Sequence, residues 1–226
     1  MKRYLLIFLI VFGSVNLYAQ INQNFYNDRM LLQIENEPVK GLTGTPFLHE
    51  DFRNGLIIAD NVEAQPAFLR YDVLEGKMEI KLDENADEVF ELPRVKDIRY
   101  AIDGSTYYMD SKRTSEGEHL EGYFIQYFEG ENIQLLGWPK MDISRARMAE
   151  TGYEKDTPAH IEVEMEYYIK MGDKRIEEVR LRPRNFSKFF DDSPGMKKYL
   201  SKNKVKDVEG AVKALEFYET NIERKD

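Results

Sequence analysis

Residues 160–182 alternate between apolar and charged side chains, and this pattern constrains the fold most. A period of two residues places alternate side chains on opposite faces of a β-strand. The pattern predicts a strand with one apolar and one acidic face, which Gly172-Asp173 then interrupts. Glycine and aspartate tolerate the positive φ angles of tight turns, so we expect an antiparallel hairpin. Its apolar positions are Ile161, Val163, Met165, Tyr167 and Ile169, and its polar positions are Glu162, Glu164, Glu166, Tyr168 and Lys170.

The register of this hairpin follows from matching the faces of its two strands. A two-residue loop would set apolar side chains against charged ones. One extra residue, as a bulge near Glu177-Glu178 or a three-residue loop that includes Lys174, restores the match. The restored register pairs Tyr167 with Val179, Glu166 with Arg180, Met165 with Leu181 and Glu164 with Arg182. We therefore interpret the glutamates as a solvated strand face neutralised by Arg180 and Arg182, rather than as a cation site or a carboxylate pair.

Short strand signals precede this hairpin at close spacing. Turns are expected at Glu75-Gly76, at Asp103-Gly104 and across Glu129–Asn132, because such residues favour hairpin loops. A two-residue turn at Asp103-Gly104 pairs Tyr100 with Tyr107. Residues 142–158 are polar and predict an irregular segment. The expected strands are 56–59, 67–73, 77–82, 89–92, 98–102, 122–128 and 133–138.

After Arg182 the pattern changes to helical spacing. A short helical turn is expected over Asn185–Phe190. Ser193-Pro194 is typical of a helix start, and Asp207 is placed to cap a helix over Val208–Ile222. Ala211, Leu215, Tyr218 and Ile222 form one stripe of that helix, which we expect to pack on the sheet.

The fold class predicted is mainly antiparallel β, as a meander, a sheet or an open barrel or sandwich, with a small C-terminal helical cap. We divide the chain into a signal peptide (1–19), an N-terminal leader (20–43), an antiparallel β domain (44–182) and C-terminal helices packed on the same domain (183–226).

The N-terminus has the pattern of a secretory signal. Lys2 and Arg3 precede the apolar run Tyr4–Phe12, and cleavage is expected after Ala19. The apolar run is too short to span a membrane, and no later stretch reaches that length. We therefore expect an exported protein of the periplasm, the outer-membrane surface or the extracellular medium, with no transmembrane segment in the mature chain.

The acidic composition narrows the classes of partner. The formal net charge is −9, which disfavours nucleic acid as a partner. The chain has no cysteine, which excludes thiol catalysis and thiolate metal sites. We find no nucleotide-binding loop and no nucleophile elbow, and so expect no cofactor and assign no catalytic residue.

A metal site is suggested only by an acidic loop. Asp83, Asn85 and Asp87 match the opening of a calcium-binding loop. However, Glu88 occupies the position of the turn glycine, and Arg94 that of the bidentate glutamate. A plain acidic hairpin loop is the favoured interpretation.

Aromatic side chains supply the candidates for binding. Trp138 could form a sugar-stacking platform with Tyr123, Phe124, Tyr127 and Phe128, although such clusters on strands more often belong to the core. The candidate binding residues are Tyr108, Trp138 and Tyr168.

Several short motifs resemble one family. Gly44-Thr45-Pro46-Phe47-Leu48, followed by Phe52 and Gly55, resembles the start of an uncharacterised secreted family common in Bacteroidota. The resemblance extends roughly from Gly44 to Ile222, and it implies export from a Gram-negative cell but no activity, cofactor or catalytic residue. The later motifs are Leu69-Arg70-Tyr71-Asp72, Lys77–Ile80, Gly122-Tyr123-Phe124, Tyr167–Lys170 and the helices around Met196–Asn203 and Ala211–Tyr218.

The sequence therefore leaves three hypotheses for function. The first is an exported, non-enzymatic envelope or secreted protein that binds a protein or glycan partner. The second is a hydrolase that uses a pair of carboxylates, which requires two acids close together in a cleft. The third is a structural module stabilised by calcium at Asp83–Asp87.

Overall fold

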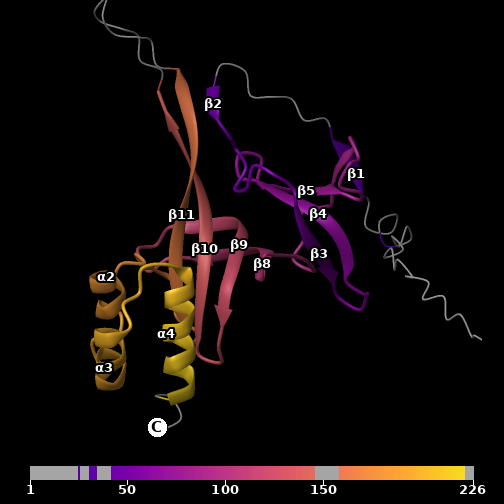
Figure 1. Cartoon of the computed structure of the whole chain (residues 1–226). Coiled ribbons are helices and arrows are strands. Elements are labelled where there is room, and N and C mark those ends of the chain that lie inside the picture. Colours follow the sequence, from indigo (N-terminus) through magenta and orange to yellow (C-terminus); the bar gives the residue numbers. More distant parts are fainter. Residues whose placement is uncertain (1–24, 26–30, 35–41, 146–157, 222–226) are drawn as a thin grey trace, which may run out of the picture.

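The structure, a computed structural model, describes residues 25, 31–34, 42–145 and 158–221. The predicted signal peptide and most of the predicted leader lie outside the described residues. One large, mostly antiparallel open sheet carries the strands in the order β1-β6-β5-β4-β3-β7-β8-β9-β10-β11-β12, and β2 pairs in parallel with β11 (Figure 1). The strands are β1 (Leu32–Ile34), β2 (Leu42–Gly44), β3 (Arg53–Ala59), β4 (Gln65–Asp72), β5 (Lys77–Lys81), β6 (Val89–Glu91), β7 (Ile98–Ile102), β8 (Ser105–Arg113), β9 (His119–Glu129), β10 (Ile133–Ser144), β11 (Ala159–Met171) and β12 (Glu177–Glu178).

The predicted fold class is confirmed, and so are the three predicted turns. Asp72 pairs with Lys77 across Glu75-Gly76, and Tyr100 pairs with Tyr107 across Asp103-Gly104. The third hairpin joins β9 to β10, with a register shift at Leu135/Leu136. β1 and the first two residues of β2 lie within the predicted leader (20–43), yet both strands pair into the sheet.

The hairpin at residues 160–182 has the predicted offset but a different extent. Tyr168 pairs with Glu178, and the Val179 N–H donates to the Tyr167 carbonyl at 2.8 Å. The pairing then ends, so the predicted ladder of Glu164 and Glu166 with Arg182 and Arg180 is wrong. Arg180 instead lies 3.9 Å from Glu178.

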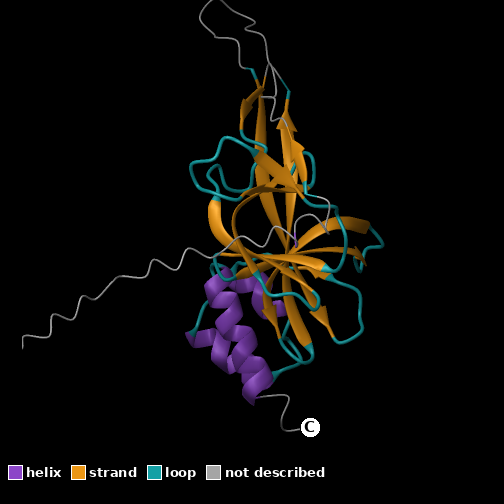
Figure 2. Ribbon diagram, turned by 90° about the vertical axis from the view of Figure 1, so that its right-hand side faces the viewer, coloured by secondary structure: helices purple, strands orange, loops and turns teal. Residues whose placement is uncertain are grey.

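The main partner of β11 is β10. The two strands pair without interruption from Ile133 opposite Met171 to Ser144 opposite His160. The prediction of an irregular segment from residue 142 is therefore wrong for 142–144; residues 146–157 lie outside the described part of the chain. β10 and β11 extend together beyond the pairing with β9, and β2 joins β11 at the far end (Figure 1). Figure 2 shows the elongated sheet from the side.

Three C-terminal helices cover one face of this strand pair, as the sequence predicts. They are α2 (Pro183–Lys188), α3 (Pro194–Lys202) and α4 (Val208–Asn221). The caps are as expected: Ser193 Oγ accepts from the Met196 N–H at 3.4 Å, and Asp207 Oδ1 accepts from the Gly210 N–H at 2.8 Å. Ala211 and Leu215 of the predicted stripe are fully buried among apolar residues of β10 and β11, whereas Ile222 lies outside the described residues.

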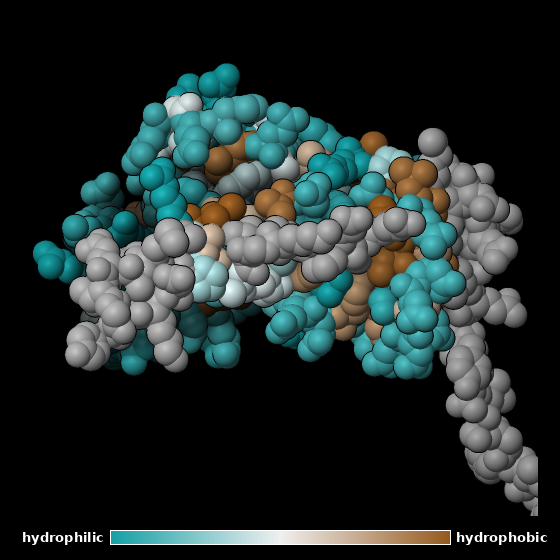
Figure 3. Space-filling view, turned by 90° about the horizontal axis from the view of Figure 1, so that it is seen from above, coloured by the Kyte–Doolittle hydropathy of each residue, from teal (hydrophilic) through white to brown (hydrophobic). Residues whose placement is uncertain are grey.

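A second core packs along the remaining strands. It centres on four tyrosines whose rings meet edge to face, with Tyr123 5.5 Å from Tyr71 and 5.9 Å from Tyr100 between ring centroids. Seen from above, much of the described surface is hydrophilic, and apolar residues show in its centre and on its right-hand side (Figure 3). Both cores follow from the alternation of apolar residues along the strands.

The segment Gly44–Leu48 ties β11 to β4. β2 pairs with Ala159–Ile161, and the Leu48 N–H then donates to the Tyr71 carbonyl at 3.0 Å. Gly44 has φ +87°, and a Cβ there would overlap the Ile161 carbonyl oxygen, so only glycine fits.

The same segment places two aromatic rings on Arg70. The guanidinium lies 3.6 Å from the centroid of Phe47 and 4.3 Å from that of Phe52. It donates from Nε and Nη2 to Glu79 Oε2 at 3.0 and 2.7 Å, and the Glu79 side chain is fully buried. Residues from three of the motifs that carry the family resemblance therefore meet in one contact.

Candidate functional site

The three binding residues predicted from the sequence lie on one face of the sheet. Tyr108 of β8, Trp138 of β10 and Tyr168 of β11 pack around the fully buried Phe124 of β9. Trp138 lies 4.7 Å from Phe124 between ring centroids, and its ring covers Gly122. Tyr108 and Trp138 are half-buried, whereas Tyr168 is buried. The surface of this cluster is therefore formed by Tyr108 and Trp138.

The aromatic platform proposed from the sequence is only partly correct. Phe124 does contact Trp138, but Tyr123 belongs to the tyrosine core on the other face. Phe128 packs towards the helices, and Tyr127 contacts both that core and the tyrosine core. Alternation along β9, with the register shift at Leu135/Leu136, separates these rings.

Charged side chains flank the aromatic residues on the β8 side. Lys112 Nζ lies 5.5 Å from the ring centroid of Tyr108 and 2.6 Å from Asp110. Partial burial alone would raise the pKa of Asp110, but hydrogen bonds from Lys112, the Ser111 backbone and Lys96 lower it to about 2. Asp110 is thus held as an anion, which is the opposite of what a general acid requires.

On the β11 side, Glu166 holds two partners. Its Oε1 accepts from Lys140 at 2.9 Å, and its Oε2 accepts from the Tyr168 hydroxyl at 2.9 Å. The bond to Glu166 raises the pKa of Lys140. Burial and then the bond to Glu166 raise the pKa of Tyr168. Glu166 is therefore neutralised by Lys140, not by Arg180.

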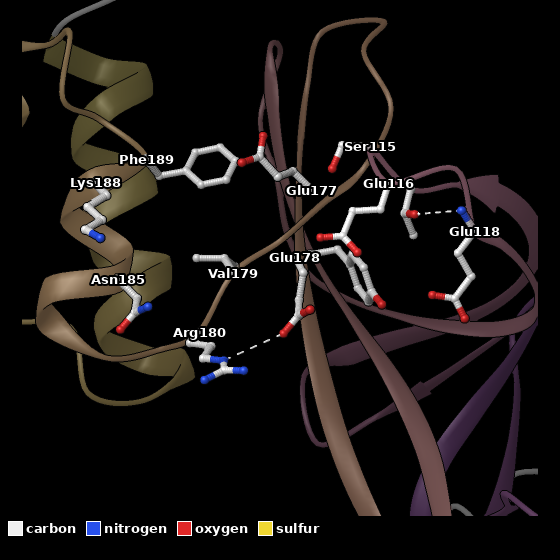
Figure 4. A pocket seen from close by; sticks show the side chains of 12 residues that line it. Ser115, Glu116, Glu118, Glu177, Glu178, Val179, Arg180, Asn185, Lys188 and Phe189 are labelled. Atoms are coloured by element: carbon white, nitrogen blue, oxygen red, sulfur yellow. Dashed lines mark hydrogen bonds and ion pairs between the residues drawn. The ribbon is translucent and has the colours of Figure 1, made fainter.

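Next to Tyr168 lies a pocket of about 380 Å³, called here the acidic pocket. Four glutamates line it, and Figure 4 shows them around one hollow with Lys188 and Asn185 of α2 on its far side. Only Arg180 and Lys188 supply positive charge among its lining residues. The glutamates are Glu116, Glu118, Glu177 and Glu178.

Backbone contacts bring these glutamates together. The loop after β8 is tied to the start of β12, because the Ser115 N–H donates to the Ile176 carbonyl at 2.8 Å and the Ile176 N–H donates to that of Arg113 at 3.3 Å. Buried Thr114 closes the loop by accepting from the Glu118 N–H at 3.1 Å. Sequence reasoning missed this site, because residues 114–118 and 177–178 meet only through the fold.

A groove of about 950 Å³ adjoins the acidic pocket and shares Glu178, Val179 and Arg180 with it. This β11 groove runs between β11 and the segment 178–182, and the start of α4 closes its far side. Its apolar residues are Met165, Tyr167, Val179, Leu181 and Val208.

The predicted calcium residues lie in an exposed turn between β5 and β6, away from both depressions. Asp83 Oδ1 accepts from the Asn85 N–H at 2.9 Å, as in an ordinary Asx turn. Within the part of the chain that the structure describes, no three His, Cys, Asp or Glu side chains are grouped to hold a metal ion.

Comparisons with protein families, with curated proteins and with solved structures find no match to this chain. Of the helices that the structure describes, none has the length and apolar character needed to cross a membrane.

Proposed function

We propose that this chain is an exported, non-enzymatic protein that binds a cationic segment of a partner protein at the acidic pocket. The observation that carries the proposal is the convergence of four glutamates with two cations around one hollow. The secretory pattern of residues 1–19 and the family resemblance support export.

The chemistry of the pocket favours a lysine or arginine side chain as its occupant. Arg180 lies at 3.9 Å from Glu178, a loose ion pair between side chains that are 69% and 52% exposed. Glu116 is exposed as well. A guanidinium or ammonium group entering the pocket would meet several carboxylates.

A glycan is the second candidate ligand, bound at the aromatic surface of Tyr108 and Trp138 rather than in the acidic pocket. Half-buried Trp138 and Tyr108 lie on the same sheet face, and flat aromatic rings beside carboxylates suit a sugar. A carboxylate-pair hydrolase also needs acids that share a cleft, so turnover belongs in the test.

The test uses the full mature chain with a photo-crosslinking residue in place of Asn185, which is exposed at the pocket. The pocket variant carries Glu116→Gln and Glu177→Gln, which keep size and remove charge. The control variant carries Glu84→Gln in the exposed β5–β6 turn.

In native envelope extract, a partner protein should crosslink to the wild type and the control, and its yield should fall at least about fivefold for the pocket variant. Equal yields for all three proteins would refute the pocket. Loss of binding with Trp138→Ala alone would favour a glycan. Turnover of a polymer substrate that the pocket variant abolishes would favour the hydrolase.

A further inference from the structure

Among the described residues, no strand pairs with the edge of β11 between β2 and β12, and this stretch is called here the open edge. β2 pairs with Ala159–Ile161, and β12 pairs with Tyr168 and Ile169. Between them, residues 162–166 have β10 on one side and no described strand on the other. At about 3.3 Å per residue, this gap leaves roughly 17 Å of strand edge.

The backbone groups that face this gap can be assigned. In an antiparallel pair, successive residues point their N–H and C=O groups to opposite sides of the strand. The Tyr167 carbonyl points towards β12, because it accepts from the Val179 N–H. Val163 and Met165 share its parity, so their N–H and C=O groups face the gap. An accessible strand edge with free N–H and C=O groups is a template for pairing with another strand.

We propose that the open edge of β11 binds an extended segment of a partner protein as an added strand, and that this segment alternates basic and apolar residues. The β11 groove supplies the space, since Met165 and Tyr167 line it together with Leu181. Strand addition to an exposed sheet edge is a general mode of peptide recognition.

The charges beside the gap select the chemistry of the segment. Glu162 and Glu164 are exposed on one face of the edge, and Asp142 lies directly opposite Glu162 on β10. Lys140 is the cation on this part of β10, and it bonds to Glu166. The groove itself is lined by five carboxylates and three cations within the described residues. Lysine or arginine at every second position would face these glutamates.

The same charges disfavour a second copy of the chain. Pairing two β11 edges would set one row of glutamates beside another, and like charges in cross-strand positions are destabilising. The apolar positions of the added strand would lie on the opposite face, next to half-buried Val163 and Met165. The chain's own segment Val179–Arg182 has the same alternation of apolar and basic residues. The pairing of β12 with β11 covers only Tyr168 and Ile169, so this segment is not paired with residues 162–166.

The inference rests on the proposed function, because both assume a partner protein. The experiment uses different variants for the acidic pocket and for the open edge, so a failure of one site can be told from a failure of the other. The probe is a fluorescein-labelled lysine–valine hexapeptide in strict alternation, titrated into the full mature chain and followed by anisotropy. One control peptide has the same composition in two blocks, and another is N-methylated at alternate residues. The protein variants are Glu164→Lys, the matched control Glu84→Lys, and the pocket variant.

The alternating peptide should bind the wild type, the Glu84→Lys control and the pocket variant alike. Glu164→Lys should weaken binding by about two- to thirtyfold. N-methylation should weaken it at least about tenfold, because it removes backbone donors. On binding, the amide hydrogens of Val163 and Met165 should become protected from exchange.

Several results would overturn the inference. They are an absence of binding, equal binding of the alternating, block and N-methylated peptides, and self-association of the chain through β11. Loss of peptide binding in the pocket variant alone would place the peptide in the acidic pocket, which also contradicts the edge. The peptide could bind the pocket variant normally while the pocket variant crosslinks the native partner as well as the wild type does. These two results together would refute the acidic pocket as the binding site and leave the open edge of β11.

Discussion

Replacing Arg70 by methionine should destabilise the protein strongly. Methionine keeps most of the length of the side chain and removes its charge. Arg70 donates two hydrogen bonds to Glu79, and one to the Glu50 carbonyl at 3.0 Å. Glu79 is fully buried, and its Oε1 has no hydrogen-bond partner among the described residues. The variant therefore leaves a buried carboxylate with only Lys77, whose Nζ lies 4.0 Å from Oε1.

The size of the effect follows from this burial. Removing one partner of a buried ion pair costs about 3–5 kcal/mol, because the other charge stays desolvated. Loss of the contacts with Phe47 and Phe52 adds to that cost, since a desolvated cation–π contact contributes about 2 kcal/mol. Lys77 offsets part of it. We expect a loss of about 3–5 kcal/mol, which lowers Tm by about 6–20 °C in a chain of this size.

Urea unfolding followed by tryptophan fluorescence measures this change, with Trp138 as the probe. The double variant Arg70→Met with Glu79→Leu is the control, since removing both charges should restore stability to within about 2 kcal/mol of the wild type. A loss below about 1 kcal/mol for Arg70→Met, or a double variant less stable than the single one, would refute the buried pair.

Three further predictions concern stability. Gly44→Ala should lower the free energy of unfolding in urea by about 2–4 kcal/mol, because of the positive φ and the contact with the Ile161 carbonyl. Gly104→Ala is the control: Gly104 has φ +78° with open space around it, so its loss should be only about 1–2 kcal/mol. Equal losses for the two variants would contradict the contact at Gly44. Glu219→Ala should lower the free energy of unfolding by about 1–3 kcal/mol, because Glu219 Oε1 accepts from the N–H groups of Asn132 and Ile133 at 3.0 Å each. An unchanged urea midpoint would dismiss this link between α4 and the β9–β10 turn. The pKa of Asp110 is lowered from 3.8 to about 2, so its stabilising contribution is present above about pH 4 and is lost as the pH falls through 2. Asp110→Asn should therefore lose less stability than the wild type over that pH range. Parallel curves of stability against pH for the two proteins would contradict this prediction.

The local part of the fold could be predicted from the sequence. Asp103-Gly104 and Glu75-Gly76 specify hairpins through backbone preferences that need no distant partner. The offset between β11 and β12 was also predictable, because a shift by one residue would have moved every side chain to the wrong face. The helix caps at Ser193 and Asp207 follow from the same kind of local chemistry.

The choice between competing strand partners could not be predicted. Both β10 and the return strand 177–182 match β11 in alternation, and the prediction paired the glutamates with Arg180 and Arg182. The uninterrupted ladder with β10 brings Lys140 to Glu166 instead. The acidic pocket was hidden for the same reason, since only the tertiary fold brings Glu116 beside Glu177.

Residue-resolved amide hydrogen exchange of the free protein tests the open edge of β11 most directly. Glu162, Glu164 and Glu166 point their N–H groups towards β10, whereas Val163 and Met165 point theirs into the gap. Exchange should therefore alternate along the strand, with the N–H groups of Val163 and Met165 exchanging at least about tenfold faster than those of the glutamates. Uniform protection from residue 162 to residue 166 would show that another strand already pairs with this edge, and would contradict the account.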